Sequence, residues 1–193
     1  MAVKKEKNKI MQLRKVIHIG GVLVPVFAIL IGKKETIILL LLILASFLIV
    51  EALKSKIPQD ILSIFYRENE LNTFSIEPLS YFISIISLLY LSFFLDEKIC
   101  FASIAILAAG DGFAGVIGRK YGKHRLYFNK NKSWEGSISG FMVALISGYY
   151  YAGWIVLIGS ASGMVAGALN KHDNIAVPYA ALVAMMLFRL ASP

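Results

Sequence analysis

The chain of 193 residues is 58% hydrophobic and only 17% charged, which excludes a water-soluble globule of ordinary composition. Its formal net charge is +8, but the basic residues lie between apolar runs, so they indicate membrane orientation and no nucleic-acid partner. Cys100 is the single cysteine, which excludes an intramolecular disulfide and a CxxC metal or redox site.

We therefore expect an all-α fold: a polytopic membrane helix bundle that forms one domain over residues 1–193. A spanning helix needs about 20 mostly apolar residues. About seven runs meet this measure, near residues 14–32, 36–53, 78–95, 99–118, 134–152, 154–170 and 175–191. The first run has no small-residue cleavage pattern, so we expect it to be retained. Residues 57–76 mix apolar and charged side chains, which is typical of a helix lying in the membrane interface.

The distribution of lysine and arginine predicts the orientation of the bundle. With a cytoplasmic N-terminus, the same side holds the N-terminal basic segment, the connection after the second span, the basic residues of 119–132, and Lys171. The opposite side keeps only Lys33, Lys34, Lys98 and Arg189. The positive-inside rule favours this orientation. Because the chain is rich in isoleucine and lysine, we expect a prokaryotic plasma membrane. The basic segments, including the stretch at residues 110–136, would then face the cytoplasm, the compartment that holds nucleotides.

An aspartate lies inside the fourth apolar run, within GDGFAGVIGRKYG at residues 110–122. A carboxylate at the centre of a spanning helix costs roughly 2.5–3.5 kcal/mol on the insertion scale, so Asp111 should face the bundle interior, a partner or a metal. An intrabundle hydrogen bond or ion pair is the structural alternative. The glycines around Asp111 let backbone approach a helix or a phosphate closely. They include Gly110, Gly112, Gly118 and Gly122.

Polar residues also stand at the ends of later spans. Lys132, Ser133 and Glu135 open the fifth run, where free N–H groups and the positive end of the helix dipole favour an anion. The structural alternative is an ordinary helix start with an acid in its first turn. Asp173 and Asn174 lie in a short turn and are otherwise common turn and cap residues.

Four motifs together resemble a known family: RKVIH at 14–18, GDGFAGVIGRKYG at 110–122, KSWEG at 132–136 and DNIAVP at 173–178. Their order and spacing are similar to those of the CTP-dependent lipid kinases, which include dolichol kinase, phytol kinase and the CTP-using diacylglycerol kinase. The resemblance implies a multi-span helical enzyme that moves the terminal phosphate of CTP to a membrane lipid hydroxyl, with Mg²⁺ or another divalent cation. The related phosphatidate cytidylyltransferases carry a longer C-terminal motif ending in His-Gly-Gly and acidic residues, which this chain lacks.

The resemblance also implies residue roles. Asp111 would bind the metal together with Asp173, because Mg²⁺ prefers oxygen ligands shared with substrate phosphates. Lys132 would contact the CTP phosphates. Glu135 would be a second metal ligand or would accept the proton of the lipid hydroxyl. The expected nucleotide-binding residues are Gly110, Gly112, Gly118, Arg119, Lys120, Gly122, Lys123, Lys132, Ser133, Asp173 and Asn174. Arg14, Lys15 and His18 would hold phosphate or orient the acceptor.

The acceptor and the class of protein leave alternatives open. A long polyprenol of the dolichol type is the first expectation, followed by phytol-like or geranylgeranyl alcohols and by diacylglycerol. The competing class is an ion-coupled transporter or assembly partner with Asp111 in an ion path. The charged groups gather on one face, which favours an enzyme working beside lipid. The remaining basic loop residues have a second explanation, contact with anionic lipid heads. The sequence carries no signal for the oligomeric state.

Overall fold

The computed structural model describes residues 18–58, 62, 66, 70–71 and 73–192. Over these residues the fold is all-α and contains no strand, only an isolated bridge between Arg125 and Ser133. The expected interfacial helix at 57–76 falls in part on residues outside the described ones, as do the first four residues of the expected first span.

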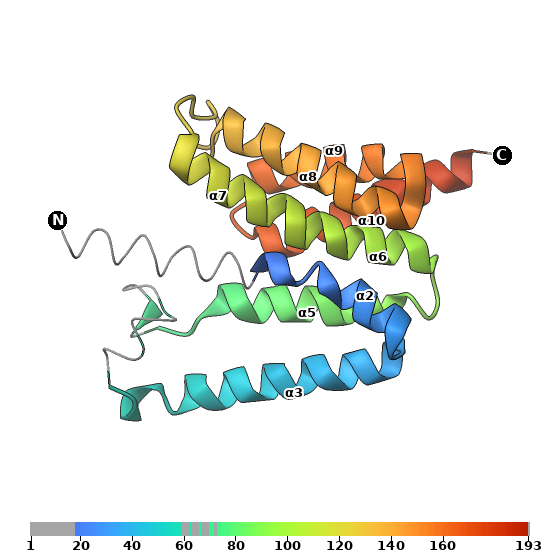
Figure 1. Cartoon of the computed structure of the whole chain (residues 1–193). Helices are drawn as coiled ribbons and strands as arrows, with labels where there is room; N and C mark the ends of the chain where they lie inside the picture. The colour runs from blue at the N-terminus through green and yellow to red at the C-terminus, as the bar shows by residue number, and fades with distance from the viewer. Residues whose placement is uncertain (1–17, 59–61, 63–65, 67–69, 72, 193) are drawn as a thin grey trace.

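The chain runs back and forth along one common direction (Figure 1). Its helices are α2 (Leu23–Leu30), α3 (Lys33–Ala52), α5 (Ile76–Leu91), α6 (Glu97–Ala105), α7 (Gly112–Tyr121), α8 (Trp134–Ala152), α9 (Val156–Leu169) and α10 (Asp173–Ala191). Three short elements are the 3₁₀ helices η1 (Lys54–Lys56) and η4 (Gly153–Ile155) and the π-helix η3 (Ile106–Asp111). Helix α6, η3 and α7 follow one another without a break, as one helical run of 25 residues.

Four helical runs among the described residues are long and apolar enough to cross a membrane: Lys33–Ala52, Glu97–Tyr121, Trp134–Leu169 and Asp173–Ala191. The third run comprises α8 and α9, which turn back on each other at η4. Two shorter apolar helices cover His18–Leu30 and Ile76–Leu91. The predicted class, an all-α membrane bundle, is confirmed. The count of seven spans and the cytoplasmic N-terminus stay predictions.

The run α6–η3–α7 forms the centre of the bundle. Its most apolar window is 78% buried inside the protein, against 17–28% for the other three long runs. Helices α5, α8 and α10 pack against it. The outer helices therefore turn most of their apolar side chains outward, as expected where lipid is the solvent. Polar groups on the central helix are buried away from water, so they need partners inside the protein.

The first span differs from its predicted range. Within the described part, residues 18–20 are helical, residues 21 and 22 form a turn, and α2 begins at Leu23. A Cβ at Gly21 would lie 1.9 Å from the hydroxyl of Tyr81, so the absence of a side chain lets this turn lie directly against α5. The interruption brings His18 to the flank of α5.

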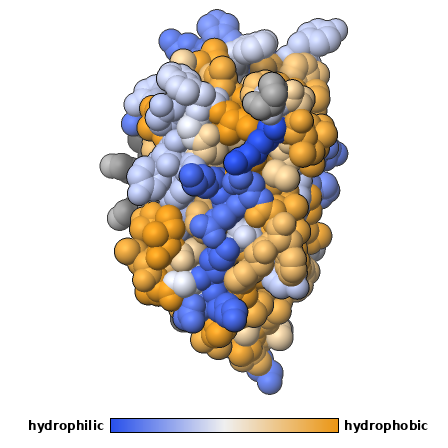
Figure 2. All heavy atoms as spheres, turned by 90° about the vertical axis from the view of Figure 1, so that its right-hand side faces the viewer, coloured by the Kyte–Doolittle hydropathy of each residue, from blue (hydrophilic) through white to orange (hydrophobic). Residues whose placement is uncertain are grey.

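The two ends of the bundle differ in charge. We call "basic end" the end that carries Lys54, Lys56, the α7–α8 loop (residues 122–133) and Lys171; it lies on the left of Figure 1. Figure 2 views the opposite end, where hydrophilic side chains form a band between apolar surfaces. There Lys33 Nζ lies 2.6 Å from Glu97 Oε2, and Arg189 pairs with Asp96. Ion pairing thus offsets charge at the opposite end.

Candidate active site

Asp111 is the last residue of the π-helix η3 in the central helical run. It is only 7% exposed, and its Oδ2 lies 3.4 Å from Nε2 of His18. A π-helical turn inside an α-helix is rare and is frequent at functional sites. A buried carboxylate beside an imidazole matches the expectation that Asp111 faces the bundle interior and a polar partner.

Two contacts hold the His18 imidazole in this place. The ring of Tyr81 lies 4.1 Å from the His18 ring, centroid to centroid, and the Tyr81 hydroxyl donates a hydrogen bond to the His18 backbone carbonyl. On the other side, a Cβ at Gly112 would lie 2.4 Å from Ile19 Cγ1 and 3.6 Å from His18 Cδ2. Gly112 therefore lets the chain at residues 18–19 approach the start of α7. Gly112 thus positions His18 against Asp111.

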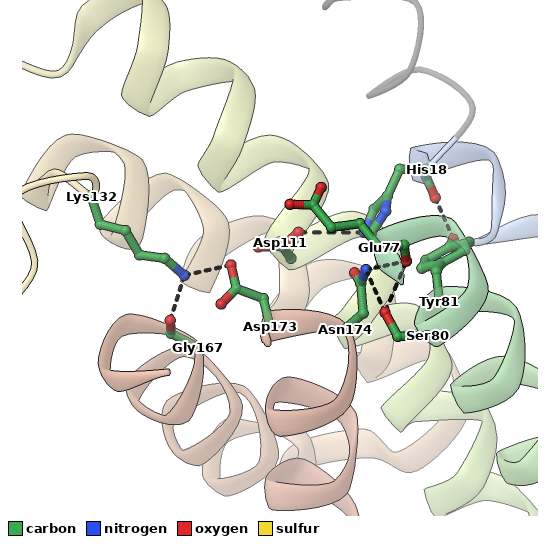
Figure 3. Close-up of polar contacts among 9 residues, drawn as sticks. All are labelled: His18, Glu77, Ser80, Tyr81, Asp111, Lys132, Gly167, Asp173 and Asn174. Atoms are coloured by element: carbon green, nitrogen blue, oxygen red, sulfur yellow. Dashed lines mark hydrogen bonds and ion pairs between the residues drawn. The ribbon is translucent and has the colours of Figure 1, made fainter. Parts of the chain in front are cut away.

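Lys132 and Asp173 form a second polar pair, shown with the first in Figure 3. Lys132 Nζ lies 2.7 Å from Asp173 Oδ2 and also donates to the backbone carbonyl of Gly167. Both side chains are about three-quarters buried. Lys132 comes from the α7–α8 loop, whereas Asp173 opens α10, which packs against η3. Two predicted site residues 41 positions apart are thus brought into contact.

Asn174 joins α10 to α5. Its side-chain amide donates to the backbone carbonyl of Glu77 over 2.8 Å and to Ser80 Oγ over 3.3 Å. These two acceptors lie in the first turns of α5, the helix that also carries Tyr81. Sequence reasoning missed Tyr81 and this end of α5. The available signal was a polar stripe at helical spacing in an apolar run: Glu77, Ser80, Tyr81, Ser84 and Ser87.

Glu135 lies in the first turn of α8 and binds the α7–α8 loop. Its carboxylate accepts hydrogen bonds from the backbone N–H of Lys123 (3.2 Å) and His124 (3.1 Å) and pairs with His124 Nδ1 at 2.7 Å. Ser133 caps the same helix, because its hydroxyl accepts the N–H of Gly136. Both residues therefore order the start of α8 and the loop before it.

The remaining predicted nucleotide-binding residues divide into two groups. Close packing surrounds Gly110, Gly118 and Gly122: a Cβ at these positions would lie 2.9 Å from Ala144 Cβ, 3.1 Å from Ser133 Oγ and 2.2 Å from the Gly118 carbonyl, respectively. The space beside these glycines is thus filled by protein. The basic residues of the second group are exposed at the end of α7 and in the following loop. They are Arg119, Lys120 and Lys123. Arg14 and Lys15 lie outside the described residues.

The carboxylates of the candidate site could bind a divalent cation only if water and substrate phosphates supplied the other ligands. Across the part of the chain that the structure describes, no three His, Cys, Asp or Glu side chains gather as a preformed metal cage. Asp111 and Asp173 are carboxylates from packed elements, and each already faces a basic side chain. Mg²⁺ usually binds one or two carboxylates and completes its shell with water and substrate phosphates. Such an open site is compatible with these residues.

The fold and the two polar pairs define a polytopic α-helical membrane protein with ionisable groups buried near its basic end. No family model matches the chain, and no solved structure matches it. Curated relatives do match. A probable chloroplastic phytol kinase of Triticum aestivum is 35% identical over 129 residues, 56% of this chain and 43% of the relative. Phytol kinase 1 of Arabidopsis thaliana is 32% identical over 115 residues, 49% of this chain and 38% of the relative.

A farnesol kinase of Arabidopsis thaliana is 40% identical over 79 residues, 39% of this chain and 25% of the relative. The matched part is thus less than half the length of each of these three relatives. The resemblance to the family that includes phytol kinase is confirmed. The relatives are named chloroplastic, so the expectation of a prokaryotic plasma membrane gains no support from them.

Proposed function

We propose that the protein is a CTP-dependent kinase that transfers the γ-phosphate of CTP to the hydroxyl of a membrane isoprenoid alcohol. The observation that carries the proposal is the buried pair of Asp111 and His18. The π-helix that carries Asp111 packs against α10, whose first residue, Asp173, pairs with Lys132. The relatives are named phytol and farnesol kinases, which favours a short isoprenoid alcohol such as phytol or farnesol over the dolichol type expected first.

The proposed reaction is a single phosphoryl transfer. The alcohol oxygen forms a bond to the γ-phosphorus, the bond between that phosphorus and the β,γ-bridging oxygen breaks, and CDP leaves. The hydroxyl proton passes to a base. Such catalysis depends mainly on positioning and on neutralising phosphate charge, so a few well-placed cationic and basic side chains suffice.

Lys132 is the residue proposed to bind phosphate. Its ammonium group is held by Asp173 and by the Gly167 carbonyl, so its position is defined before a nucleotide arrives. Charge-assisted hydrogen bonds to phosphate oxygens are stronger than neutral ones. The exposed side chains of Arg119, Lys120 and Lys123 add positive potential near the same loop, which attracts a polyanionic nucleotide.

His18 is the residue proposed to take the proton, because its imidazole lies against the Asp111 carboxylate, which would stabilise the imidazolium that forms. Asp111 and Asp173 are the carboxylates that would hold Mg²⁺, which supplies neutralisation of phosphate charge when bound. Glu135 is assigned a different role from the one first expected. Since its carboxylate accepts N–H groups of the α7–α8 loop, we propose that it orders this loop.

In the experiment, the purified protein is placed in lipid vesicles and given γ-labelled CTP, ATP, GTP or UTP. The acceptor in each sample is farnesol, phytol, geranylgeraniol, dolichol or diacylglycerol. We expect label in the isoprenoid alcohols with CTP, and loss of transfer when EDTA removes divalent cations. A parallel reaction with α-labelled CTP and phosphatidate separates a kinase from a phosphatidate cytidylyltransferase, because only the latter moves the α-phosphorus to lipid. Absence of γ-label in every lipid, with every nucleotide, would contradict the proposal.

A further inference from the structure

The α7–α8 loop is an ordered hairpin. The backbone N–H of Leu126 donates to the carbonyl of Lys132 (3.0 Å), and that of Trp134 donates to the carbonyl of His124 (2.9 Å). Between these two bonds lies the bridge that joins Arg125 to Ser133. The hairpin therefore has a defined shape.

Contacts on both sides of the tip residues fix the hairpin to the bundle. The side chain of Leu126 is buried, and the Asn129 side-chain amide donates to the Ala168 carbonyl at the end of α9 (2.9 Å). On the other side, Glu135 accepts the backbone N–H of His124. Residues 127 and 128 thus lie between two anchored positions.

The tip presents two aromatic side chains to the outside. Tyr127 is 98% exposed and Phe128 is 58% exposed. Unlike the exposed apolar residues of the long helices, they lie outside every span, on a fixed loop. Together the two adjacent side chains form a small apolar patch on an ordered loop, and exposed apolar patches rimmed by polar residues mark interaction sites. Arg125 and Lys130 flank them and are exposed as well.

The place of the hairpin indicates its partner. Figure 1 shows the loop at the upper left, at the basic end of the bundle, where α7 ends and α8 begins. Tyrosine and other aromatic residues are enriched at this level of a membrane protein, where their rings lie among lipid headgroups. Basic side chains at the same level attract anionic lipids. The combination of aromatic and basic residues matches an anionic membrane surface.

We propose that the tip of the α7–α8 hairpin is a membrane-contact surface that binds anionic phospholipid headgroups of the leaflet at the basic end. Tyr127 and Phe128 insert among the headgroups, and Arg125 and Lys130 bind lipid phosphates. Because Lys132 belongs to the same hairpin, this contact also holds the phosphate-binding lysine of the proposed active site at the lipid surface. The alternative role for the tip is to stack against the nucleotide base, and the test distinguishes this role from lipid contact.

The test uses the full chain with Tyr127→Cys, labelled with a thiol-reactive, polarity-sensitive fluorophore. Cys100 is fully buried, so the label goes to the new cysteine. The matched control is Lys171→Cys, which is exposed at the same end of the bundle in the α9–α10 turn. Both proteins are placed in vesicles of phosphatidylcholine with or without phosphatidylglycerol, and in some samples with shallow doxyl-labelled lipid as quencher.

We expect a blue shift and several-fold stronger doxyl quenching at position 127 than at 171, both larger with phosphatidylglycerol. Arg125→Gln with Lys130→Gln should remove the dependence on phosphatidylglycerol. The proposal is overturned if the two labels behave alike in every vesicle. It is equally overturned if the label at 127 responds to CTP and not to lipid, since the tip would then serve the nucleotide.

Discussion

The placement of Asp111 at the end of a π-helix determines which neighbours its carboxylate meets. A π-helical turn holds more residues than an α-helical turn, so side chains after it point in directions that an uninterrupted helix would not give them. His18 reaches Asp111 because two residues permit it. Gly112 leaves room for residues 18–19, and Tyr81 holds the His18 backbone. The candidate site thus depends on residues that carry no charge.

The variant Tyr81→Phe tests whether the Tyr81 hydroxyl positions His18. The substitution keeps the ring beside His18 and removes only the hydrogen bond to the His18 carbonyl. We expect a loss of stability of about 1 kcal/mol, typical of one hydrogen bond. We also expect kcat for phosphoryl transfer to fall several-fold while KM for CTP stays unchanged, because the imidazole loses its fixed place. Steady-state kinetics and thermal unfolding in detergent measure the two effects. Unchanged kcat would show that Tyr81 serves stability alone.

At the scale of elements, hydropathy located helices such as α8 closely, whereas the count of seven spans stays a prediction. The fifth predicted span and α8 share the bounds 134–152. An apolar run in a membrane forms a helix because its backbone groups can hydrogen-bond only to one another. Hydropathy has no term for the direction of a side chain or for a π-helical turn, so the contact between His18 and Asp111 was not predictable. The Lys132–Asp173 contact depends on packing of α9 and α10.

Close packing of α7 on α8 gives a prediction for this scale. A Cβ at Gly136 would lie 2.7 Å from the Ala114 carbonyl oxygen and 2.8 Å from Gly118 Cα, both backbone atoms that cannot rotate away. Gly136→Ala should therefore separate the two helices and destabilise the protein by about 1–3 kcal/mol, the usual range for overpacking. The control is Gly20→Ala, since a Cβ there meets nothing within 4 Å. Equal unfolding temperatures for both variants would contradict this packing.

At the scale of the whole molecule, charge separates the two ends of the bundle. Basic side chains gather at the end that holds the α7–α8 loop, while the opposite end pairs its charges across α3, α6 and α10. The candidate site lies near the basic end, and the central helix that carries Asp111 is shielded from lipid. For the proposed kinase, a site near one end of the bundle is where a nucleotide from the aqueous phase and an alcohol from the membrane could both be bound.

The positive-inside rule predicts that the basic end faces the cytoplasm, and thiol labelling measures this orientation. Single cysteines at Lys171 and at Ser192 lie at the basic and opposite ends, and buried Cys100 gives no background. With a membrane-impermeant reagent, we expect Lys171→Cys to react in inside-out vesicles and Ser192→Cys in right-side-out vesicles. The reverse pattern would place the candidate site on the side without nucleotides.

Transfer of γ-labelled phosphate from CTP to phytol or farnesol by Asp111→Asn tests the central claim most directly. The variant keeps the size of the side chain and removes its charge, and Glu97→Gln at the opposite end is the matched control. We predict a loss of about 10²-fold or more in kcat for Asp111→Asn, as when a catalytic proton acceptor or charged group is removed, and near wild-type activity for Glu97→Gln. Undiminished transfer by a correctly folded Asp111→Asn protein would contradict the account.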